Sequence, residues 1–110
     1  MKNFPSIKKN EDFRLVYKKG KSCACTELVM YVMPNGSEEN RIGISASKKL
    51  GNSITRHRMT RLCREAFRLE NTGLLQGYDI VVIVREAALG KKFSCISDAF
   101  EKLCKRHNLK

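Results

Sequence analysis

The chain has 110 residues, the size of one domain, and 42% of them are apolar, which is enough for a single core. Its 22 Lys and Arg outnumber its 11 Asp and Glu, so the formal net charge is +11. This charge favours a polyanionic partner, nucleic acid first, and no apolar run approaches the ~20 residues that span a membrane. We therefore expect a single nucleic-acid-binding domain over residues 1–110 with no membrane partner, and the charge alone does not distinguish RNA from DNA.

The N-terminal segment and the cysteines both predict a cytoplasmic location. Residues 1–13 lack the apolar core of a signal peptide. The five cysteines are an odd number, and they show no CxxC or Cys/His spacing typical of a zinc site. We expect reduced thiols in a reducing compartment, with Cys63 and Cys104 on the apolar stripes of helices.

A short helix is predicted over residues 11–19. Asn10 is a suitable N-cap, and Glu11 and Asp12 follow where the positive end of the helix dipole favours acids. Gly20 stands where a residue in the left-handed conformation would end the helix.

One face of this helix carries Phe13, Val16 and Tyr17, which are spaced i, i+3 and i+4. The residues alone favour a core stripe. The alternative is an aromatic surface on which nucleic-acid bases stack.

Strands are predicted at residues 26–33 and 41–47, with a short extended piece at 22–24 before them. The second of these strands alternates strictly between apolar and polar residues, so one of its faces is buried and the other is open. If the strands pair antiparallel, Tyr31 joins the open face. The alternation places Ile42, Ile44 and Ala46 on the buried face, and Arg41, Gly43, Ser45 and Ser47 on the open face.

Positive charge is concentrated in residues 47–68, which hold seven Lys and Arg and one acid, a formal charge of +6. Gly51 breaks the chain, Asn52 or Ser53 caps a helix, and the helix is predicted to run to about Leu69. It is amphipathic. Its packed arc contains Met59, Leu62, Cys63, Ala66, Phe67 and Leu69, and its opposite arc contains His57, Arg58, Arg61, Arg64, Glu65 and Arg68, with Arg56 off that row.

Residues 78–85 form an uninterrupted β-branched run, which predicts a central strand buried on both faces. Because this run follows a strand and a helix, a parallel β-α-β crossover is expected. A last helix covers residues 94–106. The predicted fold is an α+β sandwich in the order α-β-β-β-α-β-α, with a mostly antiparallel four-stranded sheet.

The arginine-rich helix could be a solvated face, but such faces usually mix Glu and Lys in stabilising pairs. Here all five basic residues within the helix are arginine, Arg64 and Arg68 repel each other, and only Glu65 can offset Arg61. A guanidinium is a rigid fork that binds phosphate through two hydrogen bonds and stacks on bases. The pattern therefore favours phosphate binding over solvation.

The segment SKKLGNSITRHRMTRLCREAFR, residues 47–68, resembles the signature of the bacterial ribonuclease P protein subunit. That signature has a Lys-Lys and a Gly-Asn before an Arg-Asn-Arg triplet, then further arginines and a Leu-x-Arg-x-Ala-Phe ending. KKNEDF at residues 8–13 and the strand ending in Arg85 also match, so the likeness covers nearly the whole chain. It implies a ribosomal-protein-like fold whose crossover has the rare left-handed sense.

The resemblance also implies a function. Such a protein is a non-catalytic partner of a large RNA, the ribonuclease P RNA, which removes the 5′ leader of precursor tRNA endonucleolytically to give the mature 5′ end. Mg²⁺ would be held mainly by the RNA, and the protein would be monomeric in a 1:1 ribonucleoprotein. Residues implied to face the catalytic RNA are Lys48, Lys49, Asn52, Arg56, His57, Arg58, Arg61, Arg64 and Arg68; those implied to form the leader-binding cleft are Phe13, Tyr17, Tyr31, Ser45 and Ser47.

The chain departs from the family at His57, which replaces the usual Asn of the Arg-Asn-Arg triplet. A neutral imidazole can donate or accept one hydrogen bond, but it lacks the paired donor and acceptor of an amide. The contact that this residue makes with RNA is therefore expected to differ.

Two other classes of function compete with this hypothesis. An independent nuclease needs converging carboxylates for Mg²⁺ or a histidine-based acid and base, but Asp12, Asp79 and Asp98 are scattered over different elements and only His57 and His107 are present. A ribosomal or RNA-chaperone protein with no role in tRNA processing would share the basic helix. No residue is predicted to be catalytic or to bind a metal.

Overall fold

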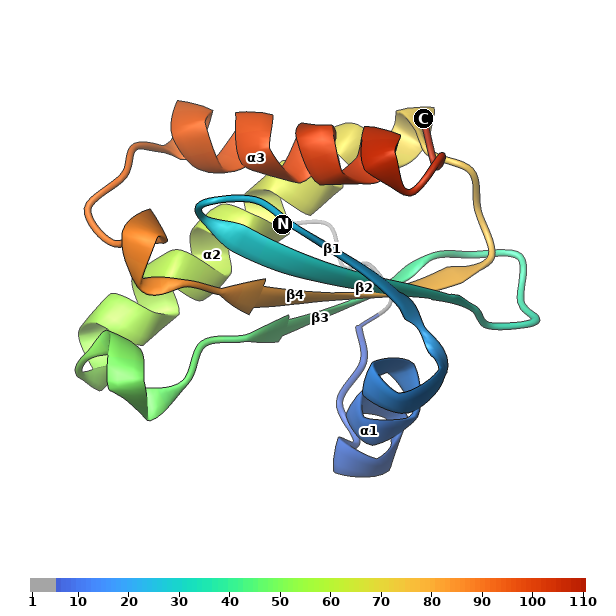
Figure 1. Ribbon diagram of the computed structural model, residues 1–110, viewed down its shortest axis with the longest axis horizontal. Coiled ribbons are helices and arrows are strands. Elements are labelled where there is room, and N and C mark those ends of the chain that lie inside the picture. The colour runs from blue at the N-terminus through green and yellow to red at the C-terminus, as the bar shows by residue number, and fades with distance from the viewer. Residues whose placement is uncertain (1–5) are drawn as a thin grey trace.

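The computed structural model describes residues 6–110, where three α-helices and a four-stranded sheet follow one another in the predicted order (Figure 1). Residues 1–5, which contribute to the targeting prediction, lie outside the described residues. Within the described part, no helix combines the length and the apolar character needed to cross a membrane. The elements are α1 (Asn10–Lys19), β1 (Lys21–Ala24), β2 (Leu28–Pro34), β3 (Arg41–Ser45), α2 (Ser53–Glu70), β4 (Tyr78–Val84) and α3 (Phe93–Arg106), with short 3-10 helices η1 (Lys48–Leu50), η2 (Asn71–Gly73) and η3 (Glu86–Ala88).

The strands lie in the order β1-β2-β4-β3. β2 pairs antiparallel with both β1 and β4, whereas β3 pairs parallel with β4. Because α2 connects these two parallel strands, the predicted β-α-β crossover is confirmed, while its left-handed sense stays a prediction. β4 is central and almost wholly buried, as its uninterrupted apolar run predicts.

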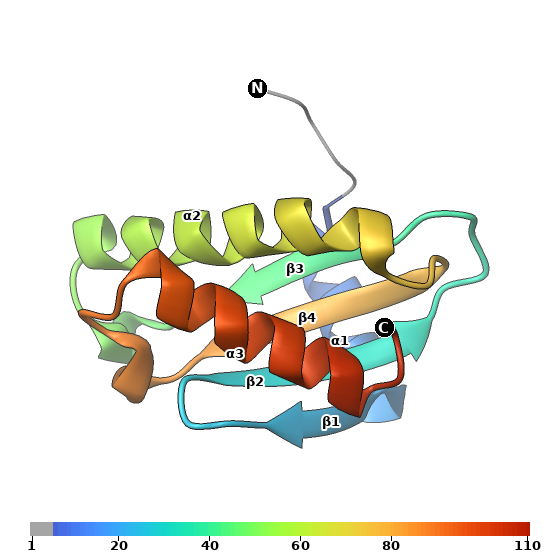
Figure 2. The same cartoon turned by 90° about the horizontal axis from the view of Figure 1, so that it is seen from above.

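The sheet separates two layers of helices of unequal size (Figures 1 and 2). α2 and α3 cover one face, and α1 lies against the other. The main core lies under α2 and α3, where the rings of Phe67 and Phe100 meet edge to face at 6.3 Å. Cys63 and Cys104 are buried there as predicted, and burial raises the pKa of each thiol to about 12.

The ends of α1 differ from the prediction. Asn10 is the first helical residue rather than the cap, and Lys9 occupies the cap position without a side-chain hydrogen bond. Gly20 is extended, with φ −75°, rather than left-handed. Its role is spatial, because a Cβ atom at Gly20 would lie 2.5 Å from the carbonyl oxygen of Val16.

Two further predictions need correction. β3 ends at Ser45, so Ser47 lies outside the strand in extended backbone before η1, and strand alternation does not apply to it. Leu69, placed on the packed arc of α2, is 49% exposed because it lies at the edge of that arc.

Candidate nucleic-acid interface

The first turn of α2 is fixed by local hydrogen bonds. Gly51 breaks the chain at φ +137°, a value that side chains disfavour. Asn52 then caps the helix, as one of the two predicted candidates, by accepting a 3.0 Å hydrogen bond from the amide of Thr55. Arg56 donates from Nε to the carbonyl of Ala46 at 2.9 Å, which ties the start of α2 to the end of β3.

The outward side of α2 carries an arginine face, which we define as His57, Arg58, Arg61, Arg64 and Arg68. All five side chains are exposed. Arg58 donates from Nη2 to the carbonyl of Lys91 at 3.1 Å. Within residues 6–110, Arg61 and Arg64 form no hydrogen bond or ion pair, so their donors are available to a ligand.

Glu65 pairs with Arg68, and the expectation that it offsets Arg61 is wrong. Nε of Arg68 donates to both carboxylate oxygens of Glu65, at 3.1 and 3.0 Å. The pairing follows the preferred order on a helix, with the acid N-terminal to the base. The hydrogen bond from Arg68 lowers the pKa of Glu65.

Four lysines extend this cationic surface. Lys48 and Lys49 are exposed in η1, which packs against the start of α2, and the predicted contact Asn52 is exposed between them and the helix. Lys91 and Lys92, also exposed, precede α3, and the bond between Arg58 and the Lys91 carbonyl brings them to the arginine face. Sequence reasoning missed these two, because only the tertiary contact places them there.

An aromatic cluster, defined as Phe13, Tyr17 and Tyr31, lies on the other face of the sheet. The rings of Tyr17 and Tyr31 meet edge to face at 5.1 Å, and Phe13 lies 6.3 Å from Tyr17. All three side chains are half-buried against a small core of Ile7, Val16 and Val81. Val16 is therefore a core residue, as the first interpretation predicts, while the aromatic rings are partly accessible and the stacking of bases on them stays a prediction.

The absence of a side chain at Gly43 leaves room for the ring of Phe13 on the sheet. A Cβ atom at Gly43 would lie 2.8 Å from two ring atoms of Phe13, so the ring rests where a side chain would otherwise stand. Tyr31, Val81 and Gly43 are aligned across the strands, which places the cluster over the middle of the sheet.

The next row of the same sheet face is Val29, Ile83 and Ser45, which are also in register. All three are half-buried, so this row continues the surface beside the aromatic cluster. Ser45 was predicted. Val29 and Ile83 were missed, although the period of two along β2 and β4 could have identified them.

Ser47 lies apart from this row. It lines a hollow of about 750 Å³ together with Lys49, Arg85 and Thr26. Arg85 donates there to the carbonyl of Cys25 at 2.9 Å.

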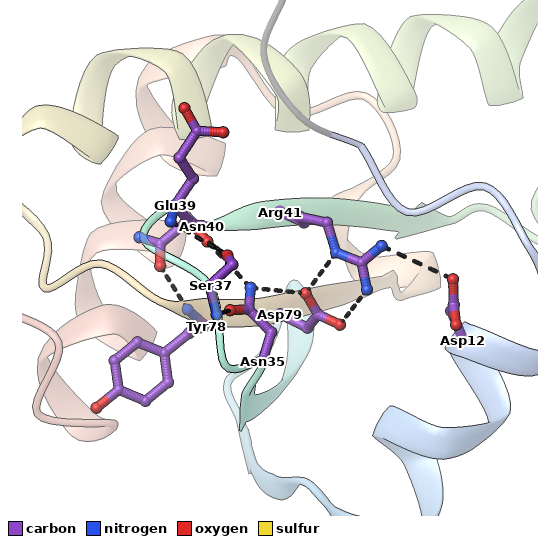
Figure 3. Close-up of polar contacts among 8 residues, drawn as sticks. All are labelled: Asp12, Asn35, Ser37, Glu39, Asn40, Arg41, Tyr78 and Asp79. Carbon is purple, nitrogen blue, oxygen red and sulfur yellow. Dashed lines mark hydrogen bonds and ion pairs between the residues drawn. The ribbon is translucent and has the colours of Figure 1, made fainter.

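Asp12 and Asp79 lie on different elements, as expected, but Arg41 contacts both of them (Figure 3). Arg41 donates to the two carboxylate oxygens of Asp79 at 2.8 and 2.6 Å, and its Nη1 lies 3.7 Å from Asp12. Asn35 donates a further hydrogen bond to Asp79 at 3.0 Å. The hydrogen bonds with Asp79 raise the pKa of Arg41. Together with the bond from Asn35 they satisfy the carboxylate of Asp79, a residue that is only 2% exposed.

The guanidinium of Arg41, rather than a metal ion, therefore occupies the space between these two carboxylates. Elsewhere in residues 6–110, no three His, Cys, Asp or Glu side chains gather in an arrangement that could hold a metal ion. The described side chains thus do not fit a Mg²⁺ ion bound by the protein alone.

Comparisons with known proteins agree on one family. A family model described as Ribonuclease P matches residues 1–108. The ribonuclease P protein component of Lachnoclostridium phytofermentans is 48% identical over 104 residues, which are 94% of this chain and 90% of that protein. The structure of the RNase P protein of Staphylococcus aureus superposes with a TM-score of 0.88 at 37% identity, covering 97% of this chain and 98% of that one.

The RNase P protein of Thermotoga maritima is similar to the chain at a TM-score of 0.86 and 30% identity, over 94% of this chain and 97% of that one. These matches also agree with the α+β fold observed here. Because they extend over nearly the full length, the chain belongs to the ribonuclease P protein family, and it is a tRNA-processing protein and a subunit of an endoribonuclease holoenzyme.

Proposed function

We propose that the chain binds the ribonuclease P RNA through the arginine face and the 5′ leader of precursor tRNA through the aromatic cluster. In this way it promotes endonucleolytic removal of the leader, while the RNA performs the chemistry. Asn52, Arg56, Lys48 and Lys49 complete the proposed surface for the catalytic RNA. Tyr31, Ser45 and Ser47, together with α1, complete that for the leader.

The observation that carries this proposal is the separation of two different surfaces by the sheet. α2, which carries the arginine face, lies on one side of the sheet, and α1 lies on the other (Figures 1 and 2). The aromatic cluster packs between α1 and that second side of the sheet. One chain can therefore contact two RNAs at once.

The chemistry of each surface suits its proposed ligand. Arg61 and Arg64 have exposed guanidinium groups without partners in residues 6–110. Such groups bind the backbone phosphates of an RNA strongly, independently of its sequence. The rings of Tyr17 and Tyr31 are partly accessible, and single-stranded nucleotides stack on such rings regardless of their sequence. A leader has unpaired bases, whereas the body of a folded tRNA does not offer them so freely.

The polypeptide alone is proposed to be inactive. In the proposed ribonucleoprotein, one protein binds one ribonuclease P RNA, and Mg²⁺ is held mainly by the RNA. Arg41 neutralises the buried carboxylate of Asp79, so this group is not available as a base or a metal ligand. The contribution of the chain is binding, orientation and neutralisation of charge.

Reconstitution tests the proposal. The chain is added to ribonuclease P RNA at limiting Mg²⁺, and leader removal from precursor tRNA is measured. We expect rescue of cleavage by the protein and no cleavage without the RNA. Specific cleavage by the chain alone, or no rescue, would contradict the proposal.

The proposed leader surface has its own test. Tyr17→Ala or Phe13→Ala is expected to weaken binding of precursor tRNA by about 1 to 3 kcal/mol per lost stack and to spare mature tRNA. Equal weakening of both tRNAs would show that these rings do not contact the leader.

A further inference from the structure

Ile54, in the first turn of α2, is 78% exposed. The other large apolar side chains that are exposed in residues 6–110 are less so: Leu15 at 41%, Leu69 at 49% and Leu75 at 56%. A single exposed apolar residue is ordinary on a protein surface. The position of Ile54 is what calls for an explanation.

Ile54 stands in line with the arginine face. Arg58 and Arg61 follow it at i+4 and i+7, so the three side chains project from one side of the helix. His57, at i+3, is its other neighbour and is also exposed. An aliphatic group and an imidazole thus lie side by side among cations.

This apolar point is held rigidly. The side chain of Asn52 caps the turn, and the bond between Arg56 and the Ala46 carbonyl fixes the helix start to β3. A ligand that contacts Ile54 would therefore meet a preformed surface and lose little free energy to ordering of the protein.

The surroundings define the chemistry of the partner. Lys48 and Lys49 lie just before this turn, and Arg58 is held beside it by the Lys91 carbonyl. The partner must combine dense negative charge with an accessible apolar part. An unpaired nucleotide has both, because its phosphate is anionic and its unstacked base is flat and apolar on its faces.

We propose that Ile54, beside His57, packs against an unstacked nucleobase of the RNA bound by the arginine face. The inference rests on the proposed function of that face and adds a non-ionic contact to it. An anionic membrane would also attract these cations, but one isoleucine buries too little apolar area to hold α2 in a lipid interface.

Binding of the full chain to ribonuclease P RNA, measured at several salt concentrations, tests this contact. Ile54→Ala is expected to bind roughly tenfold more weakly, with an unchanged slope of log K against log salt, because no ionic contact is lost. Ile54→Leu should retain the affinity. Leu75→Ala is the matched control, since Leu75 is 56% exposed but follows η2, beyond the C-terminal end of α2.

Three readouts separate the possible outcomes. The unfolding midpoint of Ile54→Ala should equal that of the wild type, so that lost affinity reports a lost contact. Chemical probing of unpaired bases should reveal a nucleotide whose reactivity changes with wild-type protein but not with Ile54→Ala. Vesicles of phosphatidylglycerol should bind wild type and Ile54→Ala equally.

Wild-type affinity of Ile54→Ala, or a weaker dependence of its affinity on salt than that of the wild type, would overturn the inference. Loss of vesicle binding with RNA binding intact would do the same and assign the residue to a membrane. If Arg58→Ala also leaves RNA affinity unchanged, the proposed function of the arginine face itself fails.

Discussion

The side chains of the arginine face are exposed, and few of them have partners within the protein, whereas those of the aromatic cluster are half-buried and pack on one another. Removing a side chain from the first surface removes little that the fold needs. Removing one from the second also disturbs the contacts between α1 and the sheet. Binding and stability should therefore be separable on the arginine face and coupled at the aromatic cluster.

Two arginines on the two sides of the sheet make this contrast measurable. Arg61 has no partner within residues 6–110, whereas Arg41 is bonded to Asp79 and lies beside Asp12, on the side of α1. The same chemical group is thus free to bind a ligand at Arg61, whereas at Arg41 it is bonded to a buried carboxylate.

Arg41→Ala should have the largest effect, a loss of about 3 kcal/mol in the free energy of unfolding, because it leaves the Asp79 carboxylate buried without its main partner. Urea denaturation measures this loss. Arg61→Ala removes the same charge and should stay within about 0.5 kcal/mol of the wild type. Equal losses of unfolding free energy in Arg41→Ala and Arg61→Ala would contradict the proposed difference between the two arginines.

A second substitution sharpens this result. In the Arg41→Ala background, Asp79→Asn removes the buried charge and should restore part of the lost stability, so the two changes would not be additive. Additive losses would mean that the ion pair is not what stabilises this end of the sheet.

Gly43→Ala should have the next largest effect. The added methyl group would meet the Phe13 ring at 2.8 Å, so the ring or α1 must shift, at a cost of about 1 to 2 kcal/mol in stability. Gly73→Ala is the control, since nothing lies within 4 Å of its Cβ position. The free energy of unfolding, measured by urea denaturation, and the affinity for precursor tRNA should both decrease. A decrease in only one of them would show that stability and binding are not coupled at the aromatic cluster.

The sequence was sufficient for features that depend on local periodicity. The period of 3.6 residues separated the arginine face of α2 from its packed side, and the β-branched run identified β4 as the central strand. Cys63 and Cys104 were placed in the core for the same reason. The assignment of the arginine face to RNA required the family resemblance, because periodicity names no ligand.

Features that depend on tertiary contacts were not predictable. Arg41 and Asp79 are 38 residues apart in the chain, so nothing local marks them as partners. Gly20 and Gly43 are needed for the close approach of Val16 and Phe13 rather than for a special φ angle, and such an approach follows only from the packing of α1. The position of Lys91 beside Arg58 has the same origin.

Arg61→Ala should have a small effect of a different kind. It is expected to make the negative slope of log K against log salt for ribonuclease P RNA less steep, by about one unit per lost phosphate contact, with the stability of the protein unchanged. Titrations between low and moderate salt measure the slope. Lys102→Ala removes an exposed cation of α3 and should leave the slope alone. An unchanged slope for Arg61→Ala would mean that this arginine does not contact phosphate.

His107 should give the smallest effect, and it extends the contrast to pH. Its Nε2 lies 3.0 Å from the carbonyl oxygen of Met30, and burial, with a smaller contribution from Lys21, lowers the pKa of the imidazole. The unfolded chain then binds a proton more readily than the folded protein, so stability is full above pH ~6.5 and falls as the pH drops below that value. His107→Gln should flatten the urea stability profile between pH 7.5 and about 5, while His57→Gln, on the exposed arginine face, is the matched control. An unaltered profile in His107→Gln would mean that the pH dependence in this range arises elsewhere.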